Sequence, residues 1–231
     1  MFTFYPMDIY YLVLVVPALV IAMIAQFKVQ SSFNKYSKIS TLRGETADSL
    51  TRKILDANGL YDIKIERTRG NLTDHYDPKA GVIRLSDSVY GKSTIAAIGV
   101  AAHEAGHAVQ RKEEYFPIKV RNSLVPVTQI ASYAAIPLAM LGLIFNNFLL
   151  PLGVILFSAV VLFQVVTLPV EFDASKRALN TLRDSNFLDE NELKGAKKVL
   201  TSAAMTYVAS AFVAVMNLLR LVLIANSRRR D

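Results

Sequence analysis

Two histidines and a glutamate stand close together in the stretch His103-Glu104-Ala105-Gly106-His107. If this stretch is helical, the two histidines lie one above the other on a single helix face, because they are four positions apart. Their ring nitrogens can then bind one zinc ion, and Glu104 can accept a proton from a water molecule on that ion. Bound zinc lowers the pKa of such a water to about 7, so a carboxylate can act as its base at neutral pH. The pattern predicts a zinc hydrolase with Glu104 as general base.

The composition limits the choice of a third zinc ligand. The chain has 231 residues and no cysteine, which excludes thiolate ligands, disulfides and iron–sulfur clusters. The remaining candidates are a carboxylate or His75, the one histidine outside the motif. We favour Glu171, which directly follows an uncharged apolar run, where a buried carboxylate is costly without a partner. The alternative is that Glu171 is a surface charge near a helix N-terminus.

Long apolar runs indicate an integral membrane protein. The chain is 52% hydrophobic and 19% charged, and uncharged runs occupy Ile9–Phe27, Val125–Phe145, Phe148–Val170 and Ala203–Leu219. A bilayer crossing needs about 20 apolar residues, and the first three runs meet that length. The first is expected to be a retained anchor, because residues 1–8 lack the basic residues of a signal peptide. We favour a crossing for the last run, although Arg220 at its end leaves open a helix that lies against the others.

The distribution of basic residues predicts the orientation. Lys and Arg are concentrated in the polar regions 28–124 and 171–202, whereas the turn Asn146-Asn147 has none. Positive charge close to membrane spans marks the cytoplasmic side, so both polar regions are expected there. The tail Arg228-Arg229-Arg230 opposes this rule if four segments cross, and it is expected to contact lipid head groups. The net charge of +7 does not predict nucleic-acid binding, because no pattern of aromatic and basic residues accompanies it.

The chain resembles the membrane-embedded neutral zinc metallopeptidases of the YugP type, and more widely the HtpX-type Glu-zincin proteases. The resemblance covers nearly the whole chain and is carried by the paired-histidine motif, the apolar hairpin and the stretch Glu171-Phe172-Asp173-Ala174-Ser175. It implies that His103, His107 and Glu171 bind zinc and that Glu104 is the base. HtpX-type chains carry an aspartate four residues after the ligand glutamate, where this chain has Ser175. The residue that supports the ligands is therefore left open between Asp173 and Ser175.

The expected fold is an α-helical integral membrane protein, with three to four transmembrane helices and a small cytoplasmic α+β zincin-like catalytic domain. In order, we expect an N-terminal anchor, a zincin-like domain, a transmembrane hairpin, a cytoplasmic helical segment with the third ligand, and a C-terminal membrane helix with a basic tail. Their bounds are 1–30, 31–124, 125–170, 171–202 and 203–231. Within the domain, periodicity predicts helices at Thr46–Asn58 and from about Thr94 to Gln110, and strands at Asp62–Arg67, Asn71–Tyr76 and Gly81–Leu85.

The predicted strand Asn71–Tyr76 suggests a role for His75. In zincin-type folds a strand edges the cleft and pairs with an extended substrate through main-chain hydrogen bonds. His75 or Tyr76 could then donate a hydrogen bond to the developing oxyanion. The alternative is that His75 is a partly exposed polar residue in a turn.

These features predict a membrane-integral zinc metalloendopeptidase of the bacterial inner membrane, with its catalytic domain facing the cytoplasm. Its partners would be the lipid bilayer and protein or peptide substrates, with membrane proteins among the candidates. A catalytically silent zinc-binding scaffold is the alternative, but a structural site has no need of the base Glu104. A zinc carrier is disfavoured, because no chain of ionisable residues lines the predicted spans.

Overall fold

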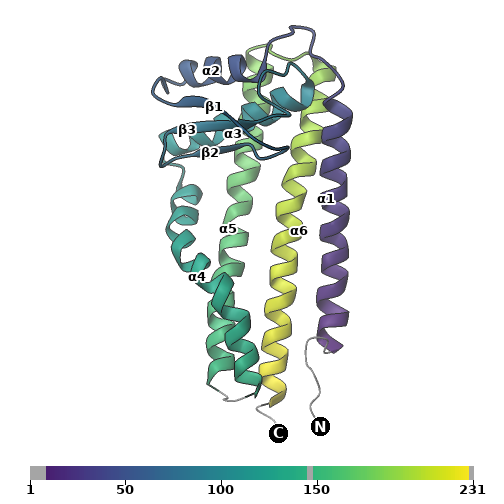
Figure 1. Cartoon of the computed structure of the whole chain (residues 1–231), viewed down its shortest axis with the longest axis vertical. Helices are drawn as coiled ribbons and strands as arrows, with labels where there is room; N and C mark the ends of the chain where they lie inside the picture. The colour runs from purple at the N-terminus through teal and green to yellow at the C-terminus, as the bar shows by residue number, and fades with distance from the viewer. Residues whose placement is uncertain (1–8, 145–147, 229–231) are drawn as a thin grey trace. The chain divides into compact units, whose positions relative to one another are not determined.

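The computed structural model describes residues 9–144 and 148–228 (Figure 1). The chain divides into two compact units, each built from separate stretches of sequence. The first comprises Met1–Ala25, Lys119–Leu168 and Thr206–Asp231, and the second comprises Gln26–Ile118 and Pro169–Met205.

Long helices dominate the described chain. The long helices are α1 (Val16–Tyr36), α4 (Phe116–Ile144), α5 (Leu149–Asp184) and α6 (Glu190–Arg228). A short π-helical turn, η1 (Tyr11–Val15), leads into α1. Within the described residues, four helical stretches are long and apolar enough to cross a membrane: Tyr11–Tyr36, Phe116–Gly142, Leu149–Asp184 and Glu190–Ser227. The fourth predicted segment thus has the length and composition of a crossing. The turn Asn146-Asn147 and the side chains of the basic tail lie outside the described residues.

Within the first unit, α4 and α5 pack closely where small residues meet. A Cβ added to Gly153 would lie 2.8 Å from the carbonyl oxygen of Ala135 and 2.8 Å from the Cβ of Ala139. Apolar helices in a membrane associate through such small residues, because the backbones can then approach closely. The two helices thus pack against each other within the segment 125–170, for which the sequence predicts a hairpin.

The second unit holds a small sheet beside two shorter helices (Figure 1). The elements are α2 (Ala47–Ala57), β1 (Lys64–Thr68), β2 (His75–Asp77), β3 (Val82–Ser86) and α3 (Ile95–Lys112). The strand order is β1-β3-β2, with β1 parallel and β2 antiparallel to β3. β2 is therefore an edge strand, and its outer side pairs with no other strand in the described part of the chain.

One apolar core joins the two polar regions of the sequence. Ile83 and Leu85 of β3 are fully buried, together with alanines of α3 such as Ala101 and Ala105. The same core contains Ala178 and Leu182 of α5 and Ala196 and Val199 of α6. The segment around Glu171 thus folds as part of the same unit as the paired-histidine helix.

The predicted strand Asn71–Tyr76 is largely wrong. Leu72 has a φ of 55°, in the left-handed region, and the strand begins only at His75. An extended run through Leu72 is impossible with that backbone conformation. The other short elements of this unit are confirmed within a few residues, and α3 continues two residues past Gln110 to Lys112.

Candidate metal centre

Helix α3 aligns the two histidines. The side chain of Thr94 caps its N-terminus by accepting a hydrogen bond from the Ala97 backbone N–H at 3.4 Å. His103 and His107 lie one turn apart in the middle of the helix, with their ring centroids 4.7 Å apart in an edge-to-face arrangement. The four-residue spacing therefore places both histidines on one face of the helix, as the sequence predicts.

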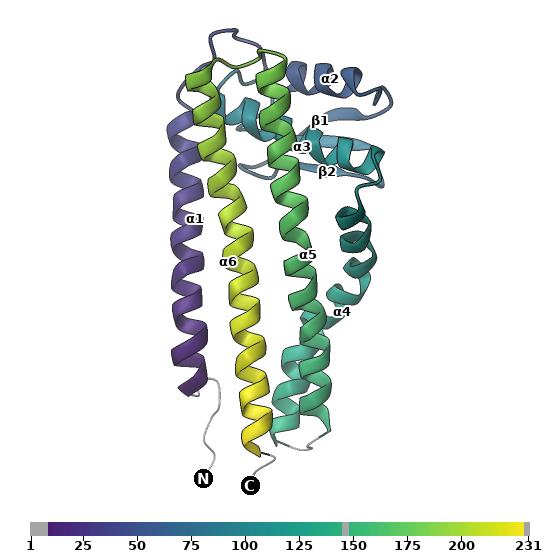
Figure 2. The ribbon, with the colours of Figure 1, turned by 180° about the vertical axis from the view of Figure 1, so that it is seen from behind.

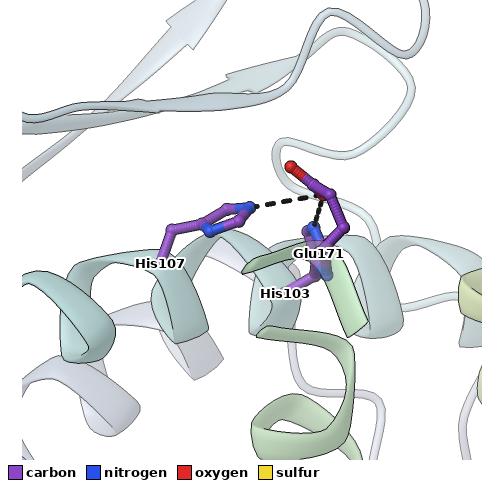
Figure 3. A group of neighbouring side chains, drawn as sticks. All are labelled: His103, His107 and Glu171. Carbon is purple, nitrogen blue, oxygen red and sulfur yellow. Dashed lines mark ion pairs between the residues drawn. The ribbon is translucent and has the colours of Figure 1, made fainter. Parts of the chain in front are cut away.

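Helix α5 brings Glu171 to the same point (Figure 3). The Oε2 atom of Glu171 lies 3.3 Å from Nε2 of His103 and 3.7 Å from Nε2 of His107. Zinc held tetrahedrally by bonds of about 2.0–2.1 Å keeps its ligand atoms about 3.3–3.5 Å apart. Glu171 is buried, and its Oε2 has no hydrogen-bond donor among the described residues. The distance to His103 falls in this range, and the distance to His107 lies about 0.2 Å beyond it. With all ligand atoms within 4.8 Å of one another, and with the orphaned oxygen of Glu171, the three side chains form a candidate metal site.

The close approach of α5 to α3 depends on Gly106. A Cβ at this position would lie 2.8 Å from the carbonyl oxygen of Ala174, a distance that real Cβ atoms do not adopt. The glycine stands between the two histidines, and Ala174 stands one turn after Glu171. The backbone contact between Gly106 and Ala174 therefore sets the position of the carboxylate relative to the imidazoles.

Gln110 orients His107 from the same helix. Its Oε1 lies 3.0 Å from Nδ1 of His107, and its Nε2 donates to the Val170 carbonyl and to Oδ2 of Asp173, both at 2.8 Å. Because the amide nitrogen faces two acceptors, the amide oxygen must face the imidazole. The hydrogen-bond network thus assigns the proton of His107 to Nδ1 and leaves the lone pair of Nε2 directed at the site.

Ser175 and Asp173 both support the ligands, each for a different histidine. Ser175 Oγ lies 3.1 Å from Nδ1 of His103, whereas Asp173 acts on His107 through Gln110. The sequence left these two residues as alternatives and did not indicate Gln110. The available signal was its position three residues after His107, which places it on the same helix face.

An ion-pair network continues outward from Asp173. Arg177, one turn further along α5, pairs with Asp173 and with Glu113 at the end of α3. The network joins the two helices beside the site. It balances the charge of Asp173, so that this carboxylate is available to Gln110 at little electrostatic cost.

The local charge favours a bound cation. Glu104 is buried on α3 beside the histidines, with 8% of its surface exposed. Burial lowers the pKa of His107, but the carboxylates of Glu171 and Glu104 outweigh this effect and hold that pKa above its usual value. Two carboxylates against two imidazoles make the pocket a site for positive charge.

His75 is not brought to this cluster. In β2 it pairs with Arg84 of β3, and its ring contacts the Thr73 carbonyl at 2.8 Å and lies near the Arg84 guanidinium. The next residue, Tyr76, packs against the core that contains α3. Because side chains alternate along a strand, His75 lies on the sheet face away from the helix with the histidines. Its role as an oxyanion donor thus gains no support from this placement.

Four apolar helices and a site of two imidazoles and one carboxylate define a membrane protein that binds zinc. The chain belongs to the family described as "Putative neutral zinc metallopeptidase", whose profile matches residues 11–226. It is also 49% identical, over 216 residues, to the protein named "Putative membrane protease YugP" of Bacillus subtilis (strain 168), covering 93% of this chain and 96% of that protein. No solved structure matches the chain. Zinc is therefore the cofactor that the family and the three converging side chains indicate. The resemblance to the YugP-type metallopeptidases is confirmed.

Proposed function

We propose that this chain is a membrane-integral zinc endopeptidase. The observation that carries the proposal is the convergence of His103, His107 and Glu171, with the free carboxylate Glu104 on the same helix. A structural zinc site needs only ligands, whereas a hydrolytic site also needs a base that is not a ligand.

Each side chain has a distinct task in the proposed reaction. Zinc bound by the three ligands supplies a Lewis acid and a water molecule of lowered pKa. Glu104 accepts the proton of the water that attacks the peptide carbonyl and returns it to the leaving amine. Gln110 and Ser175 hold the imidazoles with their Nε2 atoms toward the site. The edge strand β2 offers a free main-chain edge to an extended peptide, which supports a protein or peptide as substrate.

We further propose that the second unit faces the cytoplasm and that cleavage occurs at the membrane surface. The proposal is supported by the basic residues that flank the apolar runs in the two polar regions of the sequence. It is also supported by the position of Glu171 in α5, directly after the uncharged run that ends at Val170. Proteins of the same membrane are candidate substrates, because their chains leave the bilayer at the membrane surface, where the site is proposed to lie.

Two substitutions in the full-length purified protein test the assignment. Glu171→Ala should lose most of the zinc, because one of three ligands is removed. Glu104→Gln should keep about one zinc per chain while peptide cleavage falls by roughly 100-fold to 10,000-fold, as expected when a positioned base is lost. Glu66→Gln, at an exposed carboxylate of β1 that pairs with Arg84, is the control and should change neither property.

The outcomes separate the peptidase from a silent scaffold. Cleavage by the wild type that Glu104→Gln abolishes, at unchanged zinc content, supports the endopeptidase. Zinc bound stoichiometrically with no cleavage by the wild type favours the scaffold. Wild-type zinc affinity in Glu171→Ala would show that another residue is the third ligand.

A further inference from the structure

A groove lies between α5 and α6 in the second unit. It encloses about 290 Å³ and is lined by residues of α5 between Phe172 and Arg183 and of α6 between Lys197 and Ala204. Figure 2 shows these parts of the two helices running side by side near the loop that joins them. No residue of the zinc ligand set lines the groove.

The charge of the groove is entirely positive. Lys176, Arg183 and Lys197 line it, and among the residues that the structure describes no aspartate or glutamate does. The side-chain nitrogens of these three residues form no ion pair or hydrogen bond with another described residue. Arg177, adjacent to Lys176, is by contrast fully engaged with Asp173 and Glu113. The three cations that line the groove are thus free of ion pairs to described residues, whereas the neighbouring Arg177 is not.

The remaining lining suits a molecule that is both polar and apolar. Leu179, Leu200 and Ala204 supply apolar surface, while Asn180 and Thr201 supply hydrogen-bonding groups. A ligand with an anionic oxygen-rich part and a hydrocarbon part would satisfy both kinds of surface.

The groove also lies close to the apolar runs along each helix. On α5, one uncharged run ends at Val170, and Lys176 follows it by less than two helical turns. On α6, another uncharged run begins at Ala203, and Lys197 precedes it by the same interval. At a rise of 1.5 Å per residue, each lysine lies about 9 Å along its helix from the nearer end of the uncharged run. Lipid head groups occupy this level, and long basic side chains reach toward it.

We propose that this groove binds the phosphate-bearing head group of an anionic phospholipid. Lys176, Arg183 and Lys197 neutralise the head group, and the acyl chains continue along the apolar side of the groove. The inference does not depend on peptidase activity. Ser175 lines the groove and also contacts His103, so the bound lipid would lie one side chain away from a zinc ligand.

Lipid retention by the full-length protein tests this proposal. The protein is mixed in detergent with phosphatidylglycerol or phosphatidylcholine, and bound lipid is counted by native mass spectrometry. Wild type should retain phosphatidylglycerol at least tenfold better than phosphatidylcholine. A variant with Lys176→Gln, Arg183→Gln and Lys197→Gln should lose that preference. Thr201→Trp, which fills the groove without changing charge, should lose it too.

A charge-matched control distinguishes a site from a generally basic surface. Lys64→Gln, Arg69→Gln and Lys79→Gln remove the same charge from exposed positions in the sheet region and should leave the preference intact. Equal loss in both triple variants, or none in either, would overturn the proposal. A polyglutamate peptide is also added as a competitor. If the wild type binds this peptide more tightly than the lipid and releases the lipid, the occupant of the groove is an acidic peptide, and the proposal is overturned. Unchanged zinc content in every variant shows that the second unit is folded.

Discussion

Gln110 Oε1 lies 3.0 Å from Nδ1 of His107, while the nitrogen of the same amide donates to the backbone and side chain of α5 next to Glu171. One fully buried side chain therefore links a candidate ligand on α3 to the helix that carries the candidate third ligand. The link fixes the tautomer of His107 and the separation of the two helices together.

We expect Gln110→Leu to weaken zinc binding by about 10-fold to 100-fold, the usual effect of removing the hydrogen-bond partner of a ligand histidine. Gln110→Glu keeps an acceptor for His107 but loses both donors and places a negative charge against Asp173. Its zinc affinity should fall between those of the wild type and Gln110→Leu. Zinc affinity is measured by competition with a chelator, and the visible spectrum of the cobalt-substituted protein reports the ligand geometry.

Thr51→Val is the matched control for Gln110. Thr51 is also fully buried in the second unit, where its hydroxyl donates to the Ala47 carbonyl within α2. This variant should lower stability and leave zinc affinity and the cobalt spectrum unchanged. If Gln110→Leu also left both unchanged, the link between the helices would have no role in holding the metal.

Gly106→Ala should disrupt the site through packing alone. The added methyl group would lie 2.8 Å from the Ala174 carbonyl, so α5 must move away and take Glu171 with it. Overpacking of this kind costs about 1–3 kcal/mol, and we expect a loss of zinc affinity of at least tenfold. Gly99→Ala on the same helix is the control, because its Cβ would meet the Cβ of Ala196 at 3.4 Å. Similar zinc affinities in the two variants would contradict the proposed contact.

His75→Ala should have little effect on peptide cleavage. The imidazole lies on the sheet face with Arg84, away from the core that contains α3. We expect a loss of less than about 0.5 kcal/mol in transition-state stabilisation, as for most surface substitutions. Loss of an oxyanion donor would instead cost about 2.7–4 kcal/mol, measured as a fall in kcat. A loss of that size would restore His75 as a catalytic residue and require β2 to rearrange when substrate binds.

The stability of the second unit should depend on pH through Asp74. Burial raises the pKa of Asp74, the charge of Glu104 adds to this effect, and hydrogen bonds from Ser86 oppose it. A carboxyl whose folded-state pKa is raised stabilises the fold most below its unfolded pKa of 3.8, and this stabilisation is lost as pH rises through the folded-state value. Asp74→Asn should therefore gain stability relative to wild type as pH increases from 4 to 7, measured by thermal unfolding in detergent. A constant difference over that range would show that Asp74 has an ordinary pKa.

Reporter fusions test the proposed orientation. A reporter after Asn147 should score as external, and one inserted in the exposed stretch around Lys79 should score as cytoplasmic, because basic residues flank the runs on that side. A fusion at Asp231 decides whether α6 crosses. A cytoplasmic signal after Asn147 would show that the hairpin of α4 and α5 does not cross or that the whole chain is inverted.

The sequence alone determined the features that depend on local periodicity. Two histidines four residues apart share a helix face in any regular α-helix, so His103 and His107 could be paired without a structure. The uncharged runs are equally local, since a crossing is defined by length and polarity. Glu171 could be proposed as the third ligand because a carboxylate at the end of such a run needs a partner.

Only the tertiary structure decided which residues support those ligands. The division of labour between Ser175 and Asp173, and the role of Gln110, follow from the crossing of α3 and α5 at Gly106 and Ala174. The placement of His75 was also beyond the sequence, because the left-handed backbone at Leu72 sets where β2 begins and which face each residue takes. Helix crossings and strand register are set by contacts between distant segments, and a shift of one residue in a strand moves every side chain to the other face. Local patterns therefore predicted the three candidate ligands, and long-range packing decided which residues contact them.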